Sequence, residues 1–189
     1  MVQKMKKGKA KKRRFYIQKH KSRNLHYDFR LEIDGVLKSW AIPKGPSLNP
    51  ADKRLAMLVP DHPLEYGPFE GVIPAGSYGA GPVMLWDYGK YEFVPEGRSK
   101  KEPPPSTPEQ AFKQGALKFL LKGKKTKGRW GLIHMKGRGN AWLLVKDRDE
   151  NADRESDFVS KYPDSAKSGR SLDEIFEEDG EVNPDYAGT

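Results

Sequence analysis

The amino-acid sequence predicts a mainly β protein, a small closed antiparallel β-barrel with a few short flanking helices. Residues 26–33 alternate polar and apolar side chains without exception, which is typical of a half-buried β-strand. Asp34-Gly35 follows directly and is a strong signal for a two-residue hairpin turn. About seven such short strands in hairpins, with little helix, favour a barrel or a sandwich. We favour the closed barrel, because closure removes exposed strand edges.

The return strand of this first hairpin is predicted over residues 36–42. Four cross-strand pairs follow from the two-residue turn: Tyr27 with Ile42, Asp28 with Ala41, Phe29 with Trp40, and Arg30 with Ser39. Two of the pairs are apolar and form one face of the hairpin. On the other face small residues lie opposite Asp28 and Arg30, which leaves the room that a substrate site needs.

The remaining elements are predicted from short apolar runs and from capping signals. Six further strands are expected at residues 54–59, 83–86, 91–94, 117–122, 129–135 and 141–146. The second and third of these are expected to form a hairpin that turns at residues 87–90. A capping box begins at Thr107 and predicts a helix to about Gln114, and another short helix is expected over residues 171–178. The glycine-rich residues 71–81 are interpreted as a structural loop.

Length and charge predict one domain behind a basic tail. The chain has 189 residues and a net charge of +9, from 35 basic and 26 acidic residues. Residues 1–14 contain eight Lys or Arg and no acid, so residues 1–13 are expected to be a disordered tail that contacts phosphates loosely. Residues 14–189 are expected to form the single folded domain.

Composition also excludes several classes of protein. There is no Cys, which excludes disulfides and thiolate chemistry and leaves His and carboxylates as the strong metal ligands. No apolar run approaches the ~20 residues of a membrane span, and no apolar segment of a secretory signal follows the basic start. We therefore expect a cytoplasmic, nucleoid-associated protein that does not enter a membrane.

The polar face of the strand at residues 26–33 carries candidate metal ligands. A strand rises ~3.3 Å per residue, so His26 and Asp28 leave the same face about 7 Å apart and can both reach one divalent ion. His20 can join them only if residues 21–25 fold back as a loop, and Ser22 and Asn24 are turn-prone. Two imidazoles and one carboxylate suit Mn, Zn or Fe(II), and the spacing does not choose among them. From this strand alone, an ordinary solvated polar face is the alternative interpretation.

Several longer motifs, occurring in one order, resemble the 3′-phosphoesterase module of bacterial DNA ligase D, which also has stand-alone relatives. They are Gln18-Lys-His20, the run from His26 to Glu32, Leu37-Lys-Ser-Trp-Ala41, Pro43-Lys-Gly-Pro-Ser47, the run from Asp61 to Tyr66, and Phe69-Glu-Gly-Val-Ile-Pro74. The resemblance covers about residues 14–150, with weaker likeness at residues 168–175. One departure is Pro60, where relatives often carry an acidic residue two positions before the residue that corresponds to His62.

The resemblance implies a small β-barrel enzyme that trims the 3′ ends of DNA during repair. Such enzymes use a divalent metal, typically Mn, with Zn or Co as alternatives. They remove a terminal ribonucleoside to leave a 3′-phosphate, and they then hydrolyse that phosphate to a 3′-OH. The implied metal ligands are His20, His26 and Asp28. The other implied active-site residues are Arg30, Lys44, Arg54, His62 and Tyr66.

General chemistry assigns a role to each of these side chains. Arg30 and Arg54 suit bidentate phosphate contacts, and Lys44 suits a point-charge contact. His62 has the chemistry to donate a proton to the leaving oxygen or to stabilise the transition state. Tyr66 would hydrogen-bond the phosphate or position His62. No role is assigned to the remaining histidine, at position 134.

The partners implied by the resemblance are the DNA or DNA–RNA 3′ ends of primer-templates. A DNA ligase, a polymerase and an end-binding protein are expected to act as separate proteins. A rival hypothesis is a non-catalytic DNA-end-binding module that recruits a ligase, and the complete His20, His26, Asp28 and His62 set argues against it. A small-molecule oxygenase is a third hypothesis, which the Arg and Lys residues near the site disfavour.

Overall fold

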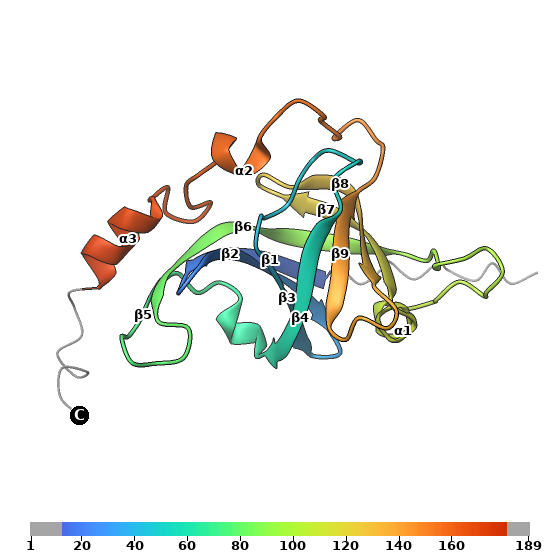
Figure 1. The fold of residues 1–189 in the computed structure, drawn as a ribbon, viewed down its shortest axis with the longest axis horizontal. Coiled ribbons are helices and arrows are strands. Elements are labelled where there is room, and N and C mark those ends of the chain that lie inside the picture. The colour runs from blue at the N-terminus through green and yellow to red at the C-terminus, as the bar shows by residue number, and fades with distance from the viewer. Residues whose placement is uncertain (1–12, 181–189) are drawn as a thin grey trace, which may run out of the picture.

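The computed structural model describes residues 13–180, which form one antiparallel sheet of nine strands (Figure 1). The strands are β1 (Arg13–Lys21), β2 (Leu25–Ile33), β3 (Val36–Ile42), β4 (Arg54–His62), β5 (Gly71–Ile73), β6 (Gly81–Val94), β7 (Ala116–Gly123), β8 (Lys127–His134) and β9 (Ala141–Lys146). Their order is β1-β2-β3-β4-β9-β8-β7-β6-β5, and pairing of β1 with β6 closes the ring. The short β5 pairs with β6 outside that ring. The predicted closed antiparallel barrel is confirmed.

Four short helices flank the barrel in the described part of the chain. They are the 3₁₀ helix η1 (Leu64–Tyr66) and the α-helices α1 (Pro108–Gln114), α2 (Phe158–Lys161) and α3 (Leu172–Asp179). The Thr107 side chain caps α1 by accepting from the backbone N–H of Gln110, as its sequence predicts. A complete capping box between Ser171 and Glu174 begins α3. The sequence analysis did not predict η1 and α2.

The first hairpin has the predicted register. The observed partners are Tyr27 with Ile42, Asp28 with Ala41, Phe29 with Trp40, and Arg30 with Ser39. Asp34 and Gly35 both have positive φ, 56° and 74°, as a tight hairpin turn requires. The apolar side chains of β2 therefore enter the barrel core, while its polar side chains lie on the outer face.

The predicted hairpin at residues 83–94 is wrong, because β6 runs without a break through the expected turn. Asp87, which looked like a turn residue, is fully buried and accepts hydrogen bonds from the backbone N–H groups of Lys124, Lys125 and Thr126. Gly89 is needed in the strand because a Cβ there would lie 2.1 Å from the backbone oxygen of Lys122. Residues 71–81 likewise contain β5 rather than only loop.

The sequence analysis also missed β1. Phe15, Tyr16 and Ile17 are all buried, so this strand shows no polar and apolar alternation. Tyr16 belongs to a small second apolar cluster with Leu37 and Leu85, on the outer face of the barrel. Both faces of β1 are therefore covered, one by the core and one by this cluster.

The predicted basic tail lies outside the described residues except for its last member. Arg13 is the first residue of β1, and its Nη1 lies 2.6 Å from Glu109 Oε1 in α1. Within residues 13–180, none of the helices has the length and apolar composition needed to span a membrane.

Candidate metal centre and active site

The three predicted metal ligands lie together at the end of the first two strands. His20 in β1 is the direct cross-strand partner of His26 in β2, and residues 22–24 make the turn between them. Asp28 Oδ2 lies 3.7 Å from His20 Nδ1 and 3.2 Å from His26 Nε2. One potential ligand atom from each of the three residues lies within 4.8 Å of the others. Residues 21–25 were expected to fold back as a loop, and the structure shows that they do so through a tight turn at residues 22–24.

The hydrogen bonds of both imidazoles fit a metal site. His20 Nε2 donates to the backbone oxygen of Gly79 at 2.6 Å, and His26 Nδ1 donates to that of Asn24 at 3.1 Å. A carbonyl oxygen can only accept, so each of these nitrogens carries a hydrogen. In a neutral ring the other nitrogen then offers a lone pair, and in both residues that nitrogen faces Asp28. A backbone carbonyl that fixes the outer nitrogen in this way is the usual support of a metal-binding histidine.

The ionised state of Asp28 also suits a cation. Burial opposes ionisation of this carboxyl, but hydrogen bonds from His20 and His26 outweigh it when these rings are protonated and no metal takes their inner nitrogens, and the nearby charge of Arg30 adds to the effect. The pKa of Asp28 therefore lies well below its usual value. Two neutral imidazoles and one carboxylate form a borderline nitrogen and oxygen donor set that fits Mn²⁺, Zn²⁺ or Co²⁺.

Arg30 is buried beneath this group and connects it to its surroundings. Its Nη2 lies 3.6 Å from Asp28 Oδ2, and its Nη1 donates to Ser39 Oγ at 2.8 Å. Its Nε donates to Gln18 Oε1, also at 2.8 Å. The guanidinium carbon lies 5.0 Å from the ring centroid of Tyr66. Most of the Arg30 donors are therefore engaged by the protein, and the side chain is fixed.

His62 ends β4 beside Arg30, and its ring lies 5.0 Å from that of Tyr66 in η1. His62 Nδ1 lies 3.1 Å from Arg30 Nη1 and 3.0 Å from the backbone oxygen of Pro60. The two contacts need opposite states, since Arg30 can only donate and the carbonyl can only accept. Burial first, and then the charge of Arg30, lower the pKa of His62. The neutral ring that accepts from Arg30 is thus favoured, and it carries its hydrogen on Nε2.

Six of the predicted residues, the site cluster, come together from three strands and η1. They are His20, His26, Asp28, Arg30, His62 and Tyr66. Lys44 is exposed in the turn after β3, and the Arg54 guanidinium lies 3.8 Å from Asp52. Within residues 13–180, no hydrogen bond or ion pair connects Lys44 or Arg54 to the site cluster. Arg54 Nε is buried without a hydrogen-bond partner among these residues.

Gln18 is a member of this site that the sequence analysis did not select. It is fully buried, and its Nε2 donates to the backbone oxygens of Tyr66, Gly67 and Phe69 at 3.0, 3.3 and 3.2 Å. Its position two residues before His20 could have indicated that it belongs to the site, because residues two apart in a strand lie on the same face.

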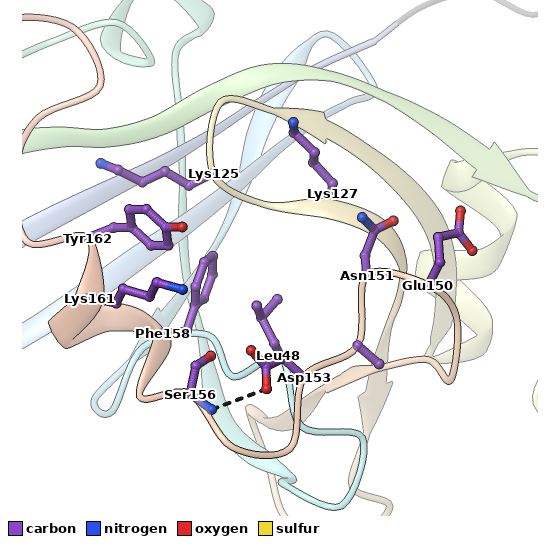
Figure 2. Close-up of a pocket in the computed structure, with 11 residues that line it drawn as sticks. Leu48, Lys125, Lys127, Glu150, Asn151, Asp153, Ser156, Phe158, Lys161 and Tyr162 are labelled. Carbon is purple, nitrogen blue, oxygen red and sulfur yellow. Dashed lines mark hydrogen bonds between the residues drawn. The ribbon is translucent and has the colours of Figure 1, made fainter.

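A separate pocket of about 330 Å³ lies at another part of the barrel (Figure 2). Its lining includes Leu48, Lys125, Lys161 and Tyr162 but none of the predicted site residues. Lys125 Nζ is engaged by the backbone oxygens of Trp86 and Asp164. This amino group is thus committed to the protein, and we place the candidate chemistry at the site cluster.

Comparison with known families decides what kind of domain this is. Residues 18–134 match the family described as the DNA Ligase D 3′-phosphoesterase domain. The chain belongs to this family. All six residues of the site cluster fall inside the matched part.

Several relatives of this phosphoesterase domain are similar over most of the chain. The multifunctional non-homologous end joining protein LigD of Pseudomonas aeruginosa is 48% identical over 164 residues, which is 84% of this chain and 18% of the relative. The corresponding protein of Mycolicibacterium smegmatis is 42% identical over 77% of this chain and 18% of the relative. That of Mycobacterium tuberculosis is 40% identical over 82% of this chain and 19% of the relative. The chain thus spans less than a fifth of the length of these relatives.

Proposed function

We propose that this protein is a metal-dependent phosphoesterase that processes the 3′ ends of DNA in break repair by non-homologous end joining. It removes a 3′-terminal ribonucleoside to leave a 3′-phosphate, and it then hydrolyses that phosphate to a 3′-OH. The observation that carries the proposal is the placement of Arg30 beside Asp28 of the three-ligand group His20, His26 and Asp28, with His62 beside Arg30. Membership of the phosphoesterase family supports it.

A divalent ion, Mn²⁺ with Zn²⁺ or Co²⁺ as alternatives, would be held by His20 Nδ1, His26 Nε2 and Asp28. When bound, such an ion polarises a phosphoryl oxygen and lowers the pKa of a bound water. Arg30 keeps Asp28 ionised and fixes its position through their 3.6 Å contact. The ligands are therefore held in place before metal or substrate arrives.

His62 acts from its Nε2, the nitrogen that Arg30 and Pro60 do not contact. In the neutral ring this nitrogen carries a hydrogen, and it donates a hydrogen bond to the leaving oxygen as charge develops there. Tyr66 donates its hydroxyl hydrogen to a phosphate oxygen. Burial raises the pKa of Tyr66, so the hydroxyl keeps that hydrogen at neutral pH.

Lys44 and Arg54 bind the DNA strand outside the site cluster. Lys44 is exposed and provides a mobile positive charge, while Arg54 has a buried Nε–H without a partner among the described residues. The terminal nitrogens of the Arg54 side chain, which is 27% exposed, would contact a phosphate oxygen. Both contacts are independent of base identity, as a general end-processing enzyme needs.

The test is a primer-template with a single 3′-terminal ribonucleotide, incubated with and without Mn²⁺, Zn²⁺ or Co²⁺. The expected result is metal-dependent shortening to a 3′-phosphate, followed by loss of that phosphate. If the protein binds this substrate but no divalent metal produces either product, the rival hypothesis of a non-catalytic end-binding module replaces ours.

The relatives are named as multifunctional end-joining proteins, and this chain matches less than a fifth of each. We propose that its products are passed to ligase and polymerase activities of the same repair reaction. A 3′-OH is the group that both of those activities need. Ligation of a nicked 3′-phosphate duplex by an added DNA ligase should therefore require prior treatment with this protein.

A further inference from the structure

The C-terminal strap, residues 165–179, packs against the barrel, and its helix α3 contacts β5 and β6 (Figure 1). The Ala166 backbone N–H donates to the backbone oxygen of Leu85 in β6 at 2.9 Å. Lys167 Nζ donates to the backbone oxygen of Pro68 at 3.0 Å. The strap lies beyond the residues that match the phosphoesterase family, 18–134.

The strongest connection between strap and barrel is the carboxylate of Glu70, whose side chain is only 2% exposed. It accepts from the backbone N–H of Leu85 at 3.0 Å and from Ser165 Oγ at 2.5 Å. Arg170 Nη2 lies 3.4 Å from its other oxygen. Arg170 is itself held by Asp179 in α3, at 2.9 Å. Among residues 13–180, the only salt bridge of this nearly inaccessible carboxylate is therefore with Arg170 in the strap.

Glu70 ends residues 66–70, the segment that contributes Tyr66 to the site cluster. The backbone oxygens of Tyr66, Gly67 and Phe69 accept from Gln18, which in turn accepts from Arg30 at 2.8 Å. The Tyr66 ring lies between those of His62 and Phe69, at centroid distances of 5.0 and 5.4 Å. Residues 66–70 are therefore held at one end by the barrel and at the other by the strap.

We propose that Glu70 and Arg170 are positioning residues of the active site. The ion pair fixes residues 66–70, so that Tyr66 stays packed on Arg30 and His62, and Gln18 keeps its hydrogen bonds. Neither residue touches the substrate. This inference rests on the proposed phosphoesterase function for its effect on rate, but its effect on residues 66–70 is independent of that function.

The test compares Arg170→Ala with Arg170→Lys and with Arg154→Ala, an exposed arginine that serves as a matched control. Displacement of reacting groups by about 1 Å costs roughly 100-fold in rate, so Arg170→Ala should lower kcat ~10- to 100-fold. KM should change less than the rate, because Tyr66 and His62 act on the transition state. Arg170→Lys should restore much of kcat, since it returns a positive charge to Glu70, and Arg154→Ala should leave kcat unchanged.

Hydrogen exchange gives a second readout that does not depend on activity. In Arg170→Ala the amides of residues 64–70 should exchange faster than in the wild type, while those of β2 and β3 should not. The affinity for Mn²⁺ alone, measured by calorimetry, should be unchanged, because the three proposed ligands belong to the β1–β2 hairpin and not to residues 64–70. Glu70→Gln, which keeps an acceptor but loses the charge, is the second variant if Arg170→Ala does not fold.

Each possible result either supports or overturns the positioning role of Glu70 and Arg170. A kcat within twofold of wild type, or a loss that only matches the unfolded fraction, overturns the positioning role. Lack of activity in the wild type with every divalent metal would defeat the proposed function instead. In that case exchange alone is decisive: faster exchange confined to residues 64–70 supports the inference, and unchanged or uniformly faster exchange overturns it.

Discussion

His20 and His26 are direct partners across the β1–β2 ladder, and their ring centroids lie 4.9 Å apart. Each ring gives one hydrogen to a backbone carbonyl and turns its other nitrogen toward Asp28. The three side chains therefore have the orientation of a ligand set without any backbone change. Such preorganisation is what distinguishes a binding site from a chance group of polar residues.

Replacement of one of these histidines should remove metal binding. We expect His26→Ala to weaken Mn²⁺ binding by more than about 100-fold, since loss of even an indirect ligand support typically costs 10- to 100-fold. Calorimetry with MnCl₂ measures this. His134→Gln is the control, because His134 bonds to Gly139 in the β8–β9 region, away from the ligands. Wild-type affinity in His26→Ala would show that the ligand assignment is wrong.

His62 should titrate below the ordinary histidine value. Burial and the charge of Arg30 lower its pKa, so NMR titration of the ring should place the midpoint under about 6.5. As the pH falls from about 6.5 toward the lower pKa of the folded protein, His62 binds a proton more readily in the unfolded chain than in the folded one. His62 therefore lowers the free energy of unfolding as the pH falls through this range. A midpoint above about 6.5 would contradict the neutral state that the Arg30 contact favours.

The kind of hydrogen donor at position 62 should matter more than its charge. His62→Ala should lower kcat by ~10²- to 10³-fold, the usual cost of losing a transition-state donor. His62→Gln should retain more activity, because its amide also donates. Steady-state rates on a 3′-phosphate primer measure both. Equal inactivity of the two variants, with a rate that falls as His62 loses its proton, would instead identify an imidazolium acid.

Residues 66–70, the segment before β5, should not tolerate a side chain at Gly67. A Cβ there would lie 2.3 Å from Cε2 of Tyr16, so the ring or the loop must move. We expect Gly67→Ala to lower the free energy of unfolding by ~1–3 kcal/mol, as overpacking usually does. Gly97→Ala is the control, since its Cβ would have no neighbour closer than 3.5 Å. Urea denaturation compares the two, and equal stability would mean that the contact relaxes freely.

Asp87 should be a strong contributor to stability although it is not part of the site cluster. It is fully buried and accepts from three backbone N–H groups and from Thr126 Oγ1. Asp87→Asn should cost about 2–3 kcal/mol in the free energy of unfolding, because hydrogen bonds to a charged acceptor are lost. Asp61→Asn, which removes an ion pair between Asp61 and Lys38, should cost only ~0–1 kcal/mol. A similar small loss at Asp87 would contradict its assigned role.

Local chemistry explains what the sequence could predict. The Asp34-Gly35 turn sets the register of β2 on β3, and turn geometry acts over only a few residues. The capping signals at Thr107 and Ser171 are equally local. The placement of His20, His26 and Asp28 together followed once the turn at residues 22–24 was allowed for.

The errors come from contacts between distant residues. Asp87 was interpreted as a turn residue because the loop that buries it, residues 124–126, is far away in the sequence. Gln18 and Glu70 were not selected because a buried polar side chain cannot be recognised without its partners, here backbone oxygens at residues 66–69 and Arg170. The conditions that make these residues important exist only in the folded chain.

The three proposed metal ligands occupy residues 20–28 and meet through one local hairpin, whereas β1 closes the barrel by pairing with the distant β6. Contacts between neighbours in sequence form earlier and faster than distant ones. During synthesis from the N-terminus, the three proposed ligands are therefore made long before the strap, residues 165–179. A chain synthesised only through β2 already contains the proposed ligands, whereas the support that the proposed reaction needs is made later, with the strap.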